Sequence, residues 1–279
     1  GSMTSICRNA HGATTKYITV KVDASSSMLA STRDAIVRSF VNTTFLESIG
    51  EVFIKITAFS GHAYEELLVT DSCLEGFCGN AAELHAAIDS LTESLEAWTF
   101  NDPGSTSVYS AITRAAASVG VDSQAHADAR SDQSNPVGTV HSVIIFTDLD
   151  ESAHHASIED VVSSLAELKP GMGTVSLVVF DPPHWMSSED PAVMARIAAH
   201  REQIAGVASS VYHANEIDAL IDAFANLADA VNREANAWYE LFICPAQRHG
   251  EHTVTVEVDG FEGNLTASFD ASGYSNTCP

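Results

Sequence analysis

The sequence has little positive charge and no long apolar run. Lysine occurs only four times, and 13 basic residues stand against 37 acidic ones, giving a formal net charge of −24. A surface of that sign repels phosphate backbones and anionic membranes, so we expect no nucleic-acid partner and favour cationic partners or metal ions. Acidic surfaces poor in lysine are also common where solubility in salt is needed, and the bulk charge has this second explanation. No apolar run approaches the roughly 18 residues that span a bilayer, so no direct membrane insertion is expected.

Common catalytic motifs are absent as well. The sequence contains no GxSxG, no GxxxxGK[ST] and no HExxH, which are typical of serine hydrolases, P-loop proteins and zinc proteases. The first predicted strand leads into Asp23-Ala24-Ser25 and not into the GxGxxG of a dinucleotide site. Ser25 and Ser27 have no histidine near them in the sequence that could act as a base. We therefore expect a binding protein and not an enzyme.

Cysteine is scarce, and its five copies lack the spacing of a zinc site. Cys73 and Cys78 bracket a short segment, whereas Cys244 and Cys278 bracket most of the C-terminal tail. The simplest interpretation is two disulfides with Cys7 left over, which implies an oxidising compartment. The alternative is five reduced thiols. The first residues, Gly-Ser-Met, look like the remainder of a cleaved expression tag, so the lack of a signal peptide carries no information.

What the sequence does contain is a regular alternation of strands and helices, with 45% apolar residues to build a core. Two strands that are apolar on both faces, at 140–147 and 174–181, indicate a parallel sheet covered by helices. Beyond residue 238 only strands are predicted. We expect an N-terminal segment (1–15), an α/β domain (16–235) and a β extension (236–279). The other expected elements are strands at 17–23, 52–59, 64–70, 209–213, 239–243, 253–258 and 265–269, helices at 28–45, 80–95, 107–119, 157–168, 191–204 and 217–231, and an exposed loop at 122–138.

Oxygen-bearing side chains occur where three of these segments should meet. The first strand ends in a DxSxS sequence with Asp23, Ser25 and Ser27, Thr106 precedes a helix, and Asp148 ends the central strand. Ligands collect outside the carboxyl ends of the strands in such sheets. Carboxylates and hydroxyls without thiol or imidazole suit a hard cation such as Mg²⁺, with Mn²⁺ or Ca²⁺ as alternatives. Because serines also cap helices, DxSxS alone is a weak signal, whereas all three pieces in order are a stronger one.

With these motifs, residues 16–232 resemble a von Willebrand factor type A (vWA) domain that carries a metal-ion-dependent adhesion site. The resemblance implies a doubly wound, Rossmann-like, mostly parallel six-stranded sheet of order 3-2-1-4-5-6 with helices on both faces. It also implies that Mg²⁺ binds through five residues and that a partner protein's Asp or Glu carboxylate completes its coordination. The five are Asp23, Ser25, Ser27, Thr106 and Asp148. The family often has glycine after the last aspartate and before the threonine, where this sequence has Leu149 and Ser105.

The tail from Tyr239 resembles the small all-β extensions that follow vWA domains in some secreted bacterial proteins, with Cys244 and Cys278 matching the two cysteines of that pattern. This second resemblance bears mainly on location, outside the cell, on its surface or in the periplasm. We expect the protein to be the monomeric recognition head of an adhesin. The alternative is an intracellular or periplasmic partner of a larger complex, of the assembly or chaperone type.

Three further residues are candidates for the rim of the ligand site. His154 follows the predicted metal aspartate and is either an exposed loop residue or a rim contact. His184 and Trp185 follow a sheet strand, so their loop should lie at the metal end. There Trp185 is either a binding anchor or folded back onto the sheet.

Overall fold

The computed structural model describes residues 4–9, 14–25, 28, 52–61, 64–92, 106–129, 138–149, 151, 155–168, 173–180, 191–236, 239–244, 250–257 and 264–270. Their elements, in chain order, are β1 (Thr4–Asn9), β2 (Thr14–Asp23), β3 (Val52–Ser60), β4 (Glu65–Leu68), the 3-10 helix η1 (Leu74–Gly76), α3 (Ala81–Thr92), α4 (Val108–Ser118), α5 (Val121–Ala129), β5 (Gly138–Thr147), α6 (Ile158–Ala166), β6 (Thr174–Phe180), α7 (Pro191–Ala205), β7 (Ser210–Ala214), α8 (Ile217–Asn236), β8 (Tyr239–Cys244), β9 (Glu251–Glu257) and β10 (Asn264–Asp270). The helix expected at 28–45 lies outside the described residues beyond Met28.

The chain forms two compact units. The larger contains residues 11–238, and the smaller combines residues 1–10 with residues 239–279. The smaller unit has two antiparallel pairs, β1 with β8 and β9 with β10. Its three C-terminal strands match the sequence prediction, whereas β1 has no counterpart in it.

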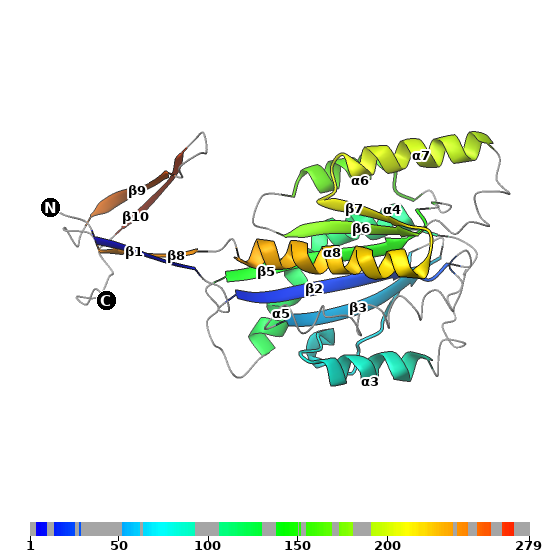
Figure 1. The fold of residues 1–279 in the computed structure, drawn as a ribbon, viewed down its shortest axis with the longest axis horizontal. Coiled ribbons are helices and arrows are strands. Elements are labelled where there is room, and N and C mark those ends of the chain that lie inside the picture. The colour runs from blue at the N-terminus through cyan, green and yellow to red at the C-terminus, as the bar shows by residue number, and fades with distance from the viewer. Residues whose placement is uncertain are drawn as a thin grey trace. The chain divides into compact units, whose positions relative to one another are not determined.

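A six-stranded sheet of order β4-β3-β2-β5-β6-β7 forms the centre of the larger unit. Numbered along this unit, that is the predicted order 3-2-1-4-5-6, and only β4 runs antiparallel to its neighbour. Figure 1 shows the strands side by side between the helices. The doubly wound fold predicted from the sequence is confirmed.

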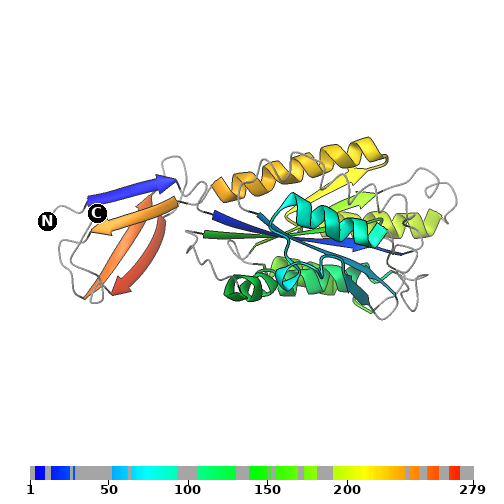
Figure 2. The same ribbon diagram turned by 90° about the horizontal axis from the view of Figure 1, so that it is seen from below.

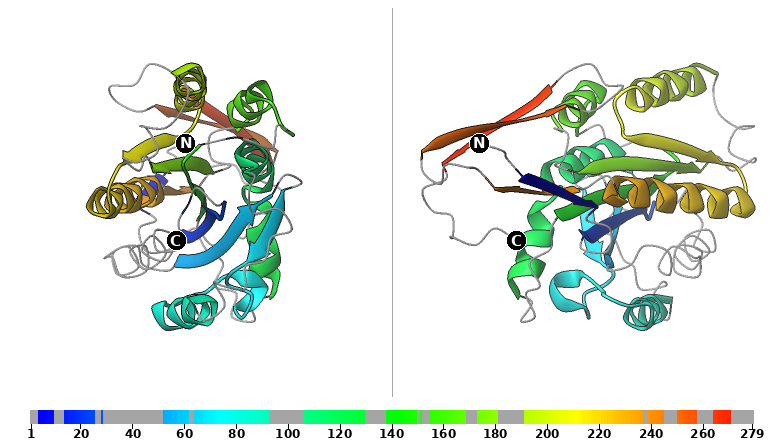
Figure 3. Two further views of the ribbon diagram at one scale, coloured as in Figure 1. Left: turned by 90° about the vertical axis from the view of Figure 1, so that its right-hand side faces the viewer. Right: turned by 60° about the vertical axis from the view of Figure 1, so that its left-hand side comes forward.

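Alternate residues of the central strands pack on opposite faces of the sheet. Ile144 and Phe146 of β5 join a cluster completed by α3 and α8, whereas Val143 and Ile145 join one completed by α4 and α6. Figures 2 and 3 show these helices on both sides of the sheet. The apolar character of β5 on both faces, already visible in the sequence, therefore follows from its double cover.

The prediction of an exposed loop at 122–138 is wrong over its first half, which is helix α5. Ser123 and His126 of α5 are buried, at 4% and 2% exposure. His126 Nδ1 is hydrogen-bonded to the Tyr17 hydroxyl at 3.0 Å, and Ser123 Oγ to His141 Nδ1 at 3.0 Å. Because polar contacts with β2 and β5 hold this helix in place, its sequence lacks an apolar stripe.

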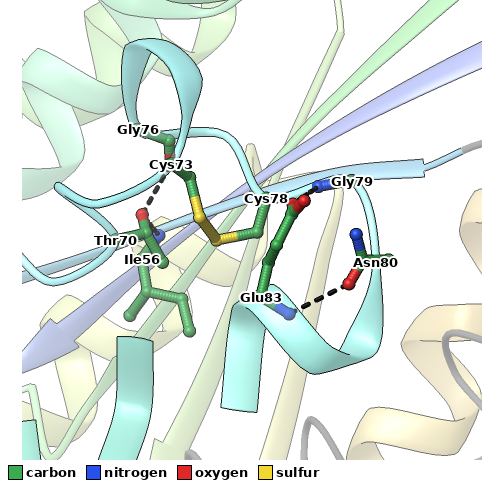
Figure 4. Close-up of a disulfide and its surroundings, with 8 residues drawn as sticks. All are labelled: Ile56, Thr70, Cys73, Gly76, Cys78, Gly79, Asn80 and Glu83. Carbon is green, nitrogen blue, oxygen red and sulfur yellow. Dashed lines mark hydrogen bonds between the residues drawn. A yellow bond between two sulfur atoms is a disulfide. The ribbon is translucent and has the colours of Figure 1, made fainter. Parts of the chain in front are cut away.

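A disulfide joins Cys73 and Cys78 as expected. Cys78 forms a β-bridge with Ile54, close to the first residue of β3. Figure 4 shows the bond beside Thr70, which donates to the Gly76 carbonyl and accepts from the Ile56 amide. The bond therefore lies near the amino-terminal end of β3. The second expected pair includes Cys278, which is outside the described residues.

None of the helices in the described part of the chain combines the length and the apolarity needed to cross a membrane.

Candidate functional site

The carboxyl ends of β2 and β5 bring two carboxylates to one edge of the sheet. Asp23 is the last residue of β2 and Asp148 directly follows β5. The two strands are parallel neighbours with Val22 opposite Phe146. Both aspartates are buried, at 0% and 1% exposure. The sequence prediction that these residues converge is supported by this register.

Asp23 is held by hydrogen bonds to both carboxylate oxygens. Its Oδ1 accepts from the Ser25 amide at 2.9 Å, and its Oδ2 accepts from the Thr147 hydroxyl at 2.7 Å. Ser25 is itself buried, at 2% exposure. The carboxylate is therefore fixed in orientation before any ligand arrives.

The electrostatic state of this edge is unfavourable for two bare carboxylates. Burial, and after it repulsion from Asp148, raises the pKa of Asp23 to about 7, against the hydrogen bonds from Ser25 and Thr147 that lower it. Desolvation and a like charge both disfavour the ionised form. A cation between the two aspartates would remove this penalty, and this is the sense in which the residues present fit a metal ion.

Thr106 reaches the same edge from another segment. It is 3% exposed and lies two residues before the first residue of α4. The next residue, Ser107, donates from its hydroxyl to the carbonyl of Gly61, which follows the last residue of β3. Since Phe59 of β3 also accepts from the Ala24 amide, the segments around Thr106 and Asp23 are joined through the end of β3.

The backbone after β5 turns sharply. Leu149 has φ +60°, in the left-handed region that favours glycine. Its amide donates to the Thr147 hydroxyl at 3.0 Å, and its side chain is buried at 4% exposure. The position where the resembling family often has glycine is therefore taken by a buried leucine in a left-handed backbone conformation.

Three residues of this edge were not singled out by the sequence analysis. Thr147 bonds Asp23, the buried Glu151 accepts from the Tyr109 amide of α4, and Arg201 of α7 donates to the Asp148 carbonyl. Only Thr147 had a local signal, because it adjoins the predicted aspartate. Glu151 and Arg201 are recognised only through long-range contacts.

Four predicted site residues, Ser27, His154, His184 and Trp185, lie outside the described residues. In the described part of the chain, no three His, Cys, Asp or Glu side chains are grouped so that they could hold a metal ion. Among the described residues at this edge, buried hydroxyl groups are carried by Ser25, Thr106 and Thr147. Serine and threonine oxygens with carboxylates form a hard donor set, which suits Mg²⁺ or Mn²⁺.

This chain resembles known proteins in structure and not detectably in sequence. No protein-family model and no curated protein matches the sequence. A mutant of the PilB minor pilin from Streptococcus sanguinis matches with a TM-score of 0.50 and 12% identity over 80% of this chain and 62% of that one. The pilus adhesin SpaC from Lactobacillus rhamnosus GG matches at 0.49 and 14%, over 95% and 39%. The conserved hypothetical protein BatB from Bacteroides thetaiotaomicron matches at 0.49 and 13%, over 79% and 99%.

The chain spans less than two thirds of the minor pilin and of the pilus adhesin. At such identities a structural match is informative about fold and not about function. The strand order of the larger unit is the one that the vWA resemblance implied, and the match to the minor pilin is a likeness of fold alone.

Proposed function

We propose that the larger unit is a metal-dependent protein-binding module. A divalent cation, with Mg²⁺ as the first candidate, would be held by five residues: Asp23, Ser25, Ser27, Thr106 and Asp148. The observation that carries the proposal is the burial of two neighbouring carboxylates among hydroxyl groups at the carboxyl edge of the sheet. A bound Mg²⁺ would supply an electrophilic coordination position for a carboxylate of a partner protein.

The protein's own groups prepare that edge for binding. The Ser25 amide and the Thr147 hydroxyl fix the Asp23 carboxylate, while Arg201 fixes the backbone at Asp148. Because the chain is strongly acidic overall, a broadly acidic partner would be repelled. The partner we propose therefore presents one Asp or Glu on a basic or neutral surface.

Adhesion outside the cell is the role we propose for this module. The Cys73–Cys78 disulfide supports an oxidising location, and a minor pilin and a pilus adhesin are among the proteins of similar structure. The alternative, an assembly-type partner inside the cell, would be favoured by free thiols at these positions in protein purified from its native source. We propose binding without catalytic turnover.

The proposal predicts that Mg²⁺ stabilises the protein more strongly at pH 8.0 than at pH 5.5. Because the pKa of Asp23 is raised to about 7, the metal-free fold keeps the contribution of the neutral carboxyl at low pH and loses it as the pH rises through 7. At pH 5.5 a proton competes with the cation for Asp23 and weakens the apparent affinity for Mg²⁺. Melting temperatures of metal-stripped protein with and without Mg²⁺, at both pH values, measure this difference. Equal shifts at the two pH values, or no shift at either, would contradict the site.

Replacing Cys73 by Ser should leave the Mg²⁺ response unchanged. The disulfide lies near the beginning of β3, whereas the proposed site lies beyond the end of that strand. Loss of a disulfide that closes a loop this short costs about 2 kcal/mol in the free energy of unfolding. Urea unfolding should show that loss, while the Mg²⁺ affinity of folded protein stays within twofold. A markedly weaker affinity would show that the two ends of the sheet are coupled.

A further inference from the structure

Helix α7 contacts both segments that carry the proposed ligands Thr106 and Asp148. The Arg201 guanidinium donates from Nη2 to the Asp148 carbonyl oxygen at 2.6 Å. The neighbouring His200 is hydrogen-bonded through Nδ1 to the hydroxyl of Tyr109, in the first turn of α4. Consecutive helical residues point about 100° apart, so a single turn of α7 reaches two separate segments of the site.

A third contact closes the ring. Glu151 Oε2 accepts from the Tyr109 amide at 2.7 Å, which joins the segment after β5 directly to α4. Three parts of the chain are thus linked pairwise by hydrogen bonds: the segment that follows β5, helix α4 and helix α7. Asp148, Tyr109 and Glu151 are 1%, 5% and 8% exposed, whereas His200 and Arg201 are half-buried, so the ring has its buried side toward the sheet edge. In such surroundings a lost hydrogen bond is costly, and no segment can move without breaking two of the three links.

From this ring we infer that α7 sets the spacing between Thr106 and Asp148 and thereby the affinity of the cation site. Arg201 and His200 are positioning residues, which act through Asp148 and Tyr109. The inference rests on the cation site proposed above and adds a regulatory element to it: a change that shifts α7 alters metal binding at the other end of these contacts.

The physical reason is the narrow geometry that Mg²⁺ requires. The ion needs near-ideal octahedral coordination, so oxygens displaced by a fraction of an ångström bind it less well. Groups that orient metal ligands commonly account for 10- to 100-fold in affinity. Charge alone has the opposite effect, because removing the Arg201 guanidinium lowers repulsion toward a nearby cation. The direction of the change in affinity therefore separates positioning from electrostatics.

The test compares Mn²⁺ and Mg²⁺ affinities, by titration calorimetry, with melting temperatures measured in EDTA. Arg201→Met should weaken metal binding about tenfold, and Arg201→Lys, which keeps the charge, should weaken it less. Tyr109→Phe keeps the aromatic side chain and removes only the hydroxyl that is hydrogen-bonded to His200. It should also weaken metal binding. Gln203→Met, on an exposed position of α7, is the matched control and should not change it.

Unchanged or tighter metal binding in Arg201→Met overturns the inference. A lower melting temperature in EDTA with unchanged affinity does so too, since it would show a structural role alone. If Arg201→Met does not fold, Tyr109→Phe decides by the same criteria. Failure of the unmodified protein to bind either metal removes the proposed cation site and the inference with it, whereas metal binding that all variants share removes only the inference.

Discussion

Asp23→Asn is expected to abolish the Mg²⁺-dependent rise in melting temperature and, at pH 8.0, to raise the melting temperature of the metal-free protein. At a Mg²⁺ concentration 100 times the dissociation constant, the free energy of unfolding of the unmodified protein should rise by about 2.7 kcal/mol. The reason is that only the folded state brings these oxygens together. Asn removes the charge that a cation requires. It also removes the ionised form that burial and Asp148 disfavour, which is why the pKa of Asp23 is raised. The same variant should therefore lose the stabilisation by Mg²⁺ and gain stability in the absence of metal.

The hydrogen bonds around Asp23 allow this exchange. An Asn carbonyl can accept from the Ser25 amide, and its NH₂ can donate to the Thr147 hydroxyl, which is an acceptor as well as a donor. Asp229→Asn, on an exposed position of α8, makes the same charge change and serves as the control. Persistence of the full Mg²⁺ response in Asp23→Asn would exclude Asp23 as part of a metal site.

Of the substitutions proposed for this protein, Phe146→Ala should cause the largest loss in the free energy of unfolding. The ring is fully buried in β5, 6.2 Å from that of Phe180, in the cluster between the sheet and α8. Removing it costs about 3–5 kcal/mol in the free energy of unfolding, from lost burial together with the cavity left behind. Urea unfolding measures this loss. Phe146→Leu should lose much less, and Ile221→Ala, at a 39% exposed position of α8, should change stability only slightly. A loss below about 1.5 kcal/mol for Phe146→Ala would show that the cluster closes over the gap.

The central strands were predictable because their apolar runs reflect their own environment. Helices cover β5 and β6 on both sides, and residues 143–146 of β5 and 177–180 of β6 are accordingly all apolar. The order of the strands came from the family resemblance carried by the DxSxS, Thr106 and Asp148 motifs. The same motifs predicted the position of Asp23 and Asp148, because they are local in sequence and end their strands.

Elements that depend on distant polar partners were not predictable. Helix α5 is short and polar, and its His126 is buried through a contact with Tyr17, which is 109 residues away. Arg201 lies 53 residues from Asp148. β1 pairs with β8 across almost the whole chain. In none of these cases does the local sequence contain the partner that stabilises the structure.

The pairing of β1 with β8 makes the two ends of the chain depend on each other. Asn9, the last residue of β1, lies opposite Tyr239, the first of β8, so the backbone passes between the two units twice. A single proteolytic cut in either crossing leaves the smaller unit attached through the other. Trimming the amino terminus to residue 13, a routine step in producing a domain, would strip β8 of its β1 partner and leave an open strand edge prone to aggregation. Shortened versions that keep residues 239–279 should therefore also keep residues 4–9.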